Sequence, residues 1–180
     1  MSRLALLDSA RHKLRLGRYH GDTLLHVLAQ NPLDVPDEPL RVSLEAHLEG
    51  LAYTGTAALE KTIRSLDPDG IPDRASIAQM IRAALASEAQ AERALARDLE
   101  NWWMGRRRQT RFAEIARDLR NDAAHDVYDK AMQGRRWQMR IGNREPVAVE
   151  DFARGFLNEL DELEALVADA ERLAGLAPAR

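Results

Sequence analysis

Apolar residues recur along most of the chain at steps of three and four, a spacing that places them on one face of an α-helix. The repeats predict helices over about residues 3–29, 39–66, 73–102, 107–132 and 149–174. Helices of about 25 residues are roughly 35–40 Å long at 1.5 Å per residue. Such lengths joined by short connections favour an up-and-down bundle. We therefore expect an all-α fold, an up-and-down bundle of four to five long helices.

Turn-forming residues separate these helices and leave two local questions open. Gly17 and Gly21 interrupt the first repeat, which is either two helices or one helix with a kink. Three prolines make residues 31–39 a loop. After a second turn-rich segment, Asp73 is expected to cap the third helix. Before the last helix, the alternation within residues 135–148 predicts either a short hairpin or an irregular loop.

The composition sets the broad class of the protein. A length of 180 residues suits a single domain over residues 1–180. Apolar residues make up 45% of the chain but aromatic residues only 5%, so the core must be mostly Leu and Ala. No stretch is apolar enough to span a bilayer, and the first residues do not resemble a signal peptide. Without Cys there is no disulfide framework and no thiolate metal site. We expect a soluble, cytoplasmic protein.

The net charge of −3 conceals an uneven distribution of charge. Residues 106–144 contain eleven basic and five acidic side chains, which gives this segment about +6 and leaves about −9 for the rest of the chain. A basic region on an acidic body suggests a local site for a polyanion. A solvated surface with many salt bridges is the alternative.

One segment of the predicted fourth helix carries a candidate motif, Leu119-Arg-Asn-Asp-Ala-Ala-His-Asp-Val-Tyr128. Its Arg120, Asn121 and His125 resemble the signature of the HEPN superfamily. In these small all-α domains an Arg is followed by a polar residue, often Asn, and by a His about five positions after the Arg. The preceding Trp102-Trp103 and the Arg-rich turn are similar to the lead-in that this family often has. The resemblance implies a ribonuclease-like domain whose active members are dimers with a composite site.

Helical geometry applies to the motif independently of this resemblance. Asn121 and His125 are four residues apart and would share one face of a helix. Arg120 precedes His125 by five residues and would point about 140° away around the same helix. One straight helix cannot easily aim both side chains at one phosphate, whereas two copies related by a two-fold axis can. We therefore expect a homodimer in which both subunits contribute to a shared cleft.

The three motif residues suit the cleavage of RNA, which carries its own nucleophile in the 2′-hydroxyl group. His125 would transfer protons, because the ordinary pKa of His lies near neutrality. Arg120 would pair with two phosphate oxygens, and Asn121 would orient His125 or the phosphate. This chemistry requires no metal and no other cofactor, and the other four histidines have no close metal-ligand spacing. The resemblance implies a product that ends in a 2′,3′-cyclic phosphate, and DNA should not be cut.

Further basic residues surround the motif and could contact RNA phosphates. They are Arg106, Arg107, Arg108, Arg117, Arg135 and Arg136. Trp137 could stack on a base, whereas Trp102 and Trp103 are expected to pack in the core. A plain solvated loop is the alternative interpretation of these basic residues.

Two main functions are consistent with these residues. The first is a metal-independent endoribonuclease that acts on RNA as a homodimer, in the role of a toxin or of a defence or stress factor. A protein antitoxin or regulator would then be a further partner. The second is a non-catalytic helical module that binds RNA or protein. A helix-turn-helix DNA binder is a third and weaker hypothesis, because the sequence contains no short recognition hairpin.

Overall fold

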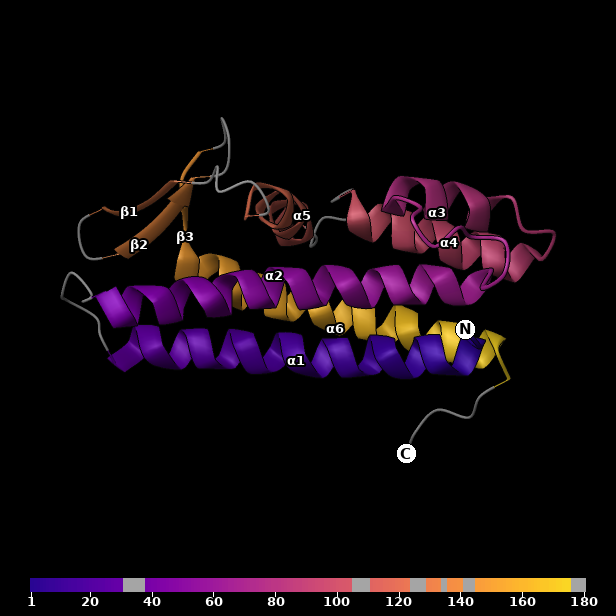
Figure 1. The fold of residues 1–180 in the computed structure, drawn as a ribbon, viewed down its shortest axis with the longest axis horizontal. Helices are drawn as coiled ribbons and strands as arrows, with labels where there is room; N and C mark the ends of the chain where they lie inside the picture. The colour runs from indigo at the N-terminus through magenta and orange to yellow at the C-terminus, as the bar shows by residue number, and fades with distance from the viewer. Residues whose placement is uncertain (31–37, 105–110, 124–128, 134–135, 141–144, 176–180) are drawn as a thin grey trace.

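Three long helices lie side by side along the longest axis of the molecule (Figure 1). They are α1 (Arg3–Gln30), α2 (Glu38–Leu66) and α6 (Val149–Leu173). Both α2 and α6 contact α1 and run in the opposite direction to it. The computed structural model describes residues 1–30, 38–104, 111–123, 129–133, 136–140 and 145–175, without the side chains at 38, 111, 121–123, 129–133 and 136.

A second layer of shorter elements lies against α2, above it in Figure 1. It contains the helices α3 (Ile77–Leu85), α4 (Gln90–Trp103) and α5 (Arg111–Ala123). It also contains an antiparallel sheet in the order β1-β2-β3, formed by β1 (Asp129–Gln133), β2 (Arg136–Arg140) and β3 (Val147–Ala148). Because α4 and α5 also contact α6, the second layer rests on two of the three long helices.

The expected all-α bundle is confirmed. The described ranges contain six helices, and their strands are at most five residues long. Of the two alternatives for residues 135–148, the structure shows antiparallel pairing of β2 with β3, in which Gln138 is opposite Ala148 and Met139 is opposite Val147. On its other edge β2 pairs with β1, from Asp129 with Arg140 to Gln133 with Arg136. The first repeat forms one continuous helix and not two.

The prediction of the fourth helix is wrong at the C-terminal end of this helix. The helix predicted over residues 107–132 is described only as α5, which ends at Ala123, and Asp129–Gln133 is a strand. Met139 of the central strand β2 is 1% exposed and holds this strand against the core. The backbone of β2 pairs with β1 on one edge and with β3 on the other. Pairing with β2 therefore overrides the helical period of the local sequence.

The third predicted helix, over residues 73–102, is two helices separated at residues 86–89. The cap of α3 is Ser76 and not Asp73: the Ser76 hydroxyl accepts a hydrogen bond from the backbone N–H of Gln79, and the Gln79 side chain accepts one from the backbone N–H of Ser76. At the break, the Ser87 hydroxyl accepts a hydrogen bond from the backbone N–H of Ala89. Ser side chains that bond to nearby backbone groups in this way compete with helix formation.

Glycines allow the long helices to approach one another closely. A Cβ atom at Gly55 of α2 would lie 2.7 Å from the Phe156 ring of α6. A Cβ atom at Gly21 of α1 would lie 2.7 Å from the Leu157 side chain, also on α6. The two glycines thus mark close contacts between helices, and Gly21 does not interrupt α1.

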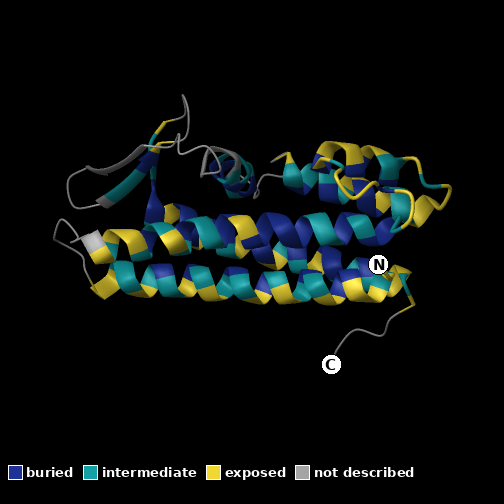
Figure 2. Ribbon diagram, in the orientation of Figure 1, coloured by how far each residue is buried: buried dark blue, intermediate teal, exposed yellow. Residues whose placement is uncertain are grey.

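The buried side chains form one cluster to which all six described helices contribute, and Figure 2 shows the buried positions on their inner faces. Trp102 is fully buried, as expected, while Trp103 is half-buried against the same cluster. The rings of Phe152 and Phe156 stack with their centroids 5.5 Å apart. Within the described ranges, no helix is both long enough and apolar enough to cross a membrane.

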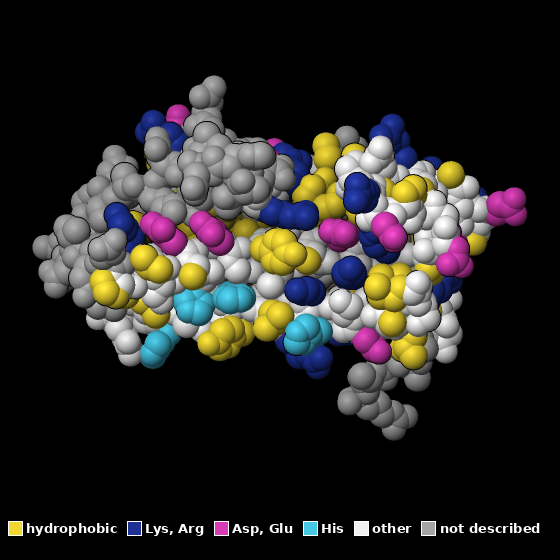
Figure 3. Space-filling model, in the orientation of Figure 1, with side chains coloured by type: hydrophobic (Ala, Val, Ile, Leu, Met, Phe, Trp, Pro, Cys, Tyr) yellow, Lys and Arg dark blue, Asp and Glu magenta, His cyan; other side chains and the backbone are white. Residues whose placement is uncertain are grey.

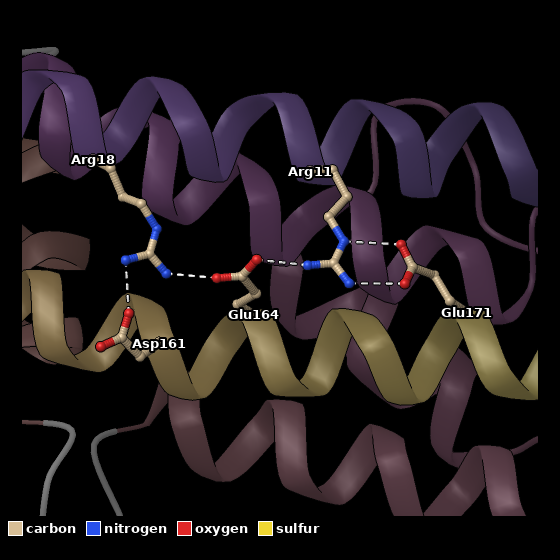
Figure 4. Close-up of polar contacts among 5 residues, drawn as sticks. All are labelled: Arg11, Arg18, Asp161, Glu164 and Glu171. Carbon is tan, nitrogen blue, oxygen red and sulfur yellow. Dashed lines mark hydrogen bonds and ion pairs between the residues drawn. The ribbon is translucent and has the colours of Figure 1, made fainter. Parts of the chain in front are cut away.

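Ion pairs join α1 to α6 on the outer side of this cluster (Figure 4). Glu164 bridges two arginines of α1, at 2.7 Å from Arg11 and 2.6 Å from Arg18. Arg11 also forms a two-pronged pair with Glu171, and Arg18 pairs with Asp161 at 2.7 Å. The paired carboxylates raise the pKa of Arg11, with the Glu171 hydrogen bond as the largest cause. The network adds polar contacts between α1 and α6 to those of the buried side chains.

Candidate active site

The N-terminus of α5 is held by a buried carboxyl group of α6. Glu159 is 1% exposed, and its Oε1 accepts a hydrogen bond of 2.8 Å from the backbone N–H of Phe112. Its Oε2 accepts a second, short hydrogen bond from the backbone N–H of Ala113. The first N–H groups of a helix have no partner within the helix. Glu159 therefore caps α5 from the neighbouring helix.

The environment of Glu159 favours the neutral form of its carboxyl group. Burial raises the pKa of Glu159 to about 8, the two backbone hydrogen bonds act to lower it, and the charge of Glu162 acts to raise it. The main-chain oxygen of Glu159 accepts a hydrogen bond of 3.0 Å from the indole N–H of Trp102. One turn of α6 thus fixes both the end of α4 and the start of α5.

Arg120 lies in the last turn of α5 and rests on the surface of α2. Its Nη2 lies 3.8 Å from Oε2 of Glu60, and its guanidinium carbon lies 5.8 Å from the centroid of the Tyr53 ring. An ion pair of this length, between partly exposed groups, contributes little to stability, and the face of the ring attracts the cation. The Arg120 side chain remains 30% exposed and thus accessible to an anion from solvent.

Cations from two other helices lie over the ring of Tyr53. Besides Arg120 of α5, it has the Nζ of Lys13 of α1 at 5.7 Å from its centroid. Tyr53 is 51% exposed, a large fraction for an aromatic residue in the middle of a long helix. The three side chains therefore form a cluster of one ring and two cations on the surface, at the junction of α1, α2 and α5.

Arg117 is the other predicted RNA-binding residue whose side chain is described. Its Nε donates a hydrogen bond of 2.9 Å to Asp118, and its guanidinium lies 3.6 Å from Glu114 and 5.8 Å over the Trp103 ring. These contacts within α5 and to α4 already balance its charge. Arg117 is therefore a weaker candidate for binding a phosphate than Arg120.

Several predicted site residues lie outside the described residues. Asn121 belongs to α5 by its backbone, and Arg136 belongs to β2, but the side chains of both are not described. The other predicted residues outside the description are His125, Arg106, Arg107, Arg108 and Arg135. How His125 and Asn121 lie relative to Arg120 therefore stays a prediction.

Trp137, predicted as a base-stacking residue, is half-buried and packs against the core. It lines a small apolar pocket where the sheet meets α1 and α2, together with Leu28, Leu44, Leu48 and Met139. This packing explains the position of the indole without a nucleic acid. Trp137 is thus less suited to stacking on a base than Tyr53.

Two histidines without a nearby sequence motif meet between α1 and α2. The Nδ1 atoms of His20 and His47 lie 3.1 Å apart, so that one ring donates a hydrogen bond to the other. Burial lowers the pKa of His20, and the charge of His47 lowers it further. The exposed ring of Tyr19 meets both imidazoles edge-on. Among the residues that the structure describes, no group of three or more His, Cys, Asp or Glu side chains could hold a metal ion.

No pattern in the sequence indicates that Tyr53, Lys13 and Glu60 are neighbours of Arg120. These residues come from α1 and α2, and no local motif relates them to the last turn of α5.

In comparisons with known proteins, no family model matches the chain, and neither a curated protein nor a solved structure gives a significant match.

Proposed function

We propose that the protein is a metal-independent endoribonuclease-like protein that acts as a homodimer through Arg120, Asn121 and His125. The observation that carries the proposal is the spacing of these residues in the sequence, with Arg120 in the last turn of a packed helix and 30% exposed. A partly exposed guanidinium on a rigid element is suited to binding a phosphate in a fixed orientation. Glu159 supports the same arrangement, because it fixes the other end of α5.

In the proposed mechanism, the 2′-hydroxyl group of the RNA attacks the adjacent phosphorus and displaces the 5′ oxygen of the next nucleotide. The His125 of one subunit accepts the hydroxyl proton and then donates it to the departing oxygen, opposite the Arg120 of the other subunit. Arg120 stabilises the negative charge that develops on the phosphate oxygens. Asn121 orients His125 or the phosphate. The products are a 2′,3′-cyclic phosphate and a free 5′-hydroxyl group.

The long contact between Arg120 and Glu60 is compatible with this role. At 3.8 Å the two groups are close to the limit of an ion pair, and both are partly exposed. A phosphate can offer two oxygens to the guanidinium fork, an arrangement that is stronger than a single long contact. The phosphate can therefore displace Glu60 from Arg120 when RNA binds.

The biological setting belongs to the same proposal. A metal-independent nuclease suits a toxin or a defence or stress factor, controlled by a protein antitoxin or regulator. The absence of Cys from the sequence is consistent with a cytoplasmic location.

A second candidate is a non-catalytic helical module that binds RNA or protein. It is favoured by the contacts of Arg120 with Glu60 and Tyr53, which give this side chain a role in packing α5 on α2. In that case Arg120→Ala would change the affinity for RNA or the stability of the protein, and there would be no cleavage rate to change.

Cleavage of labelled single-stranded RNA in the presence of EDTA tests the proposal. We expect the wild-type protein to produce fragments that end in a 2′,3′-cyclic phosphate and to leave the corresponding DNA intact. The variants His125→Ala and Arg120→Ala should lose at least about a hundredfold in rate, while the control Arg154→Ala, at an exposed position of α6, should cleave normally. No cleavage by the wild type, or equal cleavage by His125→Ala, would contradict the proposal.

A further inference from the structure

The cluster of Lys13, Tyr53 and Arg120 suggests how a nucleic acid strand is held. We propose that Tyr53 is a stacking platform for one base of a single-stranded RNA, and that Lys13 and Arg120 bind the phosphates on either side of that base. This inference rests on the proposed function and extends it, because it assigns binding residues on α1 and α2, which lie outside the sequence motif.

The geometry of the cluster fits this role. The ring of Tyr53 is half-exposed, and the two cations lie at 5.7 and 5.8 Å from its centroid. Lys13 comes from α1 and Arg120 from α5, so the cations reach the ring from separate helices. A strand that stacks one base on the ring has a phosphate on each side of that base. Both cations lie over the ring, so a base that stacks on it takes the place of one cation, and the displaced side chain is long enough to meet a flanking phosphate.

The chemistry of single-strand binding requires this combination. Proteins that bind single strands without strict sequence preference use aromatic rings for the bases and positive charges for the backbone. Stacking tolerates any base, because every base has a flat aromatic face. Each cation that neutralises a phosphate also releases counterions, which makes the binding dependent on salt.

Among the described side chains, Glu60 is the acidic partner of this cluster, and it does not cancel the charge of the two cations. Glu60 is shared between Arg120 at 3.8 Å and Arg64 at 3.5 Å, and both contacts are long. Among the described contacts, Glu60 pairs with Arg120 and not with Lys13. Within the described part of the chain, the cluster therefore has a positive balance that complements a polyanion.

The surface continues from Tyr53 along α1 and α2. Tyr19 is 60% exposed and lies against the imidazoles of His20 and His47. Position 19 is six residues from Lys13 along α1, which corresponds to about 9 Å at 1.5 Å per residue. Figure 3 shows hydrophobic, basic, acidic and histidine side chains interspersed on this face of the molecule. A neighbouring nucleotide of the same strand can reach the second ring.

The test is a binding measurement that does not depend on cleavage. The probe is a short fluorescent 2′-O-methyl oligoribonucleotide of mixed sequence, which lacks the free 2′-hydroxyl group. The readout is the fluorescence anisotropy of this probe as the protein is added. We expect Tyr53→Ala to weaken binding about tenfold or more, whereas Tyr53→Phe keeps the ring and should bind as the wild type does. Thermal melting of each variant controls for folding, since a half-exposed side chain can be removed without opening the core.

The charge contribution is measured by the same titration at several salt concentrations. Lys13→Gln should weaken binding and reduce the slope of log affinity against log salt by about 0.7, the value of one phosphate contact to a single strand. The matched control is Arg154→Gln, which removes a cation from an exposed ion pair of α6 and should leave both quantities unchanged. An equal effect of Lys13→Gln and Arg154→Gln would overturn the assignment of Lys13.

The outcomes separate this inference from the proposed nuclease activity. If the wild type cleaves unmodified RNA and Tyr53→Ala binds the probe as tightly as Tyr53→Phe does, the inference fails and the nuclease proposal stands. If binding requires Tyr53 but unmodified RNA is not cut, the inference stands and the catalytic proposal fails. If Tyr53→Ala changes the mass of the assembly measured by light scattering and leaves RNA affinity unchanged, this face is a contact between copies of the chain. The inference is then overturned.

Discussion

The backbone N–H of Phe112 donates a hydrogen bond of 2.8 Å to the Glu159 carboxyl group, which links the first turn of α5 to the middle of α6. Arg120 is eight residues further along α5, more than two turns from this bond. Because α5 is a rigid element, the position of Arg120 on α2 depends on the contact at Phe112. The candidate site is thus supported by a buried group that takes no part in the proposed chemistry.

The protonation of Glu159 should make stability depend on pH. The pKa of Glu159 is raised to about 8 in the folded protein from an ordinary value of 4.5, mainly by burial. The unfolded chain therefore releases this proton at lower pH than the folded chain. The contribution of Glu159 to stability is fully present below pH 4.5 and is lost as the pH rises towards 8.

Denaturant titrations of the wild type and Glu159→Gln across this pH range measure the effect. We expect the difference in unfolding free energy, wild type minus variant, to fall with rising pH by on the order of 1 kcal/mol per pH unit within the window. Glu150→Gln, at a more exposed carboxyl group of the same helix, is the control and should show no such slope. A constant difference between the wild type and Glu159→Gln would contradict the assignment.

The imidazole of His20 should make the stability depend on pH in the opposite direction to Glu159. Its pKa is lowered from 6.5 by burial and then by His47, so the folded protein takes up this proton less readily than the unfolded chain does. Stability should therefore decrease as the pH falls below 6.5, and His20→Gln should remove part of that decrease. Thermal melting between pH 7 and pH 5 is the measurement, with His26→Gln at an exposed position of α1 as control. An identical pH profile for the wild type and His20→Gln would refute the prediction.

The close approach of α2 and α6 should make Gly55 intolerant of a side chain. A Cβ atom there would lie 2.7 Å from the ring of Phe156, which is fully buried and cannot move aside easily. We expect Gly55→Ala to reduce the unfolding free energy by about 1–3 kcal/mol, despite the better helix propensity of Ala.

The matched comparison for Gly55 is Gly21→Ala, measured by the same urea titration. Its Cβ atom would meet the side chain of Leu157, which is only half-buried and can change rotamer. The loss of stability should therefore be smaller than at Gly55. Equal or reversed losses at the two positions would show that the rigidity of the neighbour does not decide the result.

The bridging carboxylate of Glu164 should contribute modestly to the contact between α1 and α6. It pairs with both Arg11 and Arg18 but is 43% exposed, so solvent screens both pairs. We expect Glu164→Gln to lower the unfolding free energy by about 1 kcal/mol or less, and the loss should shrink at high salt. Asp169→Asn removes a carboxylate from a single pair within α6 and should have a smaller effect. A salt-independent loss at Glu164 would argue against an electrostatic contribution.

The sequence predicted the long helices well and the second layer less well. Helices α1, α2 and α6 begin and end within about two residues of their expected bounds, because each has a long apolar repeat. The break between α3 and α4 depends on two hydrogen bonds of the Ser87 hydroxyl group, which donates to Glu92 and accepts from the backbone N–H of Ala89. The repeat of Ala and Leu on both sides of Ser87 gives no indication of this break. Strand β1 depends on pairing with β2, and its own residues carry no clear alternation.

The candidate site was predictable only in its local part. The spacing of Arg120, Asn121 and His125 is a property of one segment, so the sequence alone shows it. The neighbours Tyr53 and Glu60 are at least sixty residues from Arg120, and Glu159 is nearly forty residues away. Their positions result from how the helices pack, which no local pattern encodes.

The composite site in a dimer is tested most directly by mixing two inactive variants. Arg120→Ala retains His125, and His125→Ala retains Arg120, so a mixed dimer has one pair of the required groups in its shared cleft. After the two proteins are unfolded together and refolded, we expect RNA cleavage in EDTA to return to about a quarter of the wild-type rate, because about half of the dimers are mixed and each has one of its two pairs intact. A mixture as inactive as either variant alone, from dimers shown by light scattering to have exchanged subunits, would contradict a site shared between two subunits.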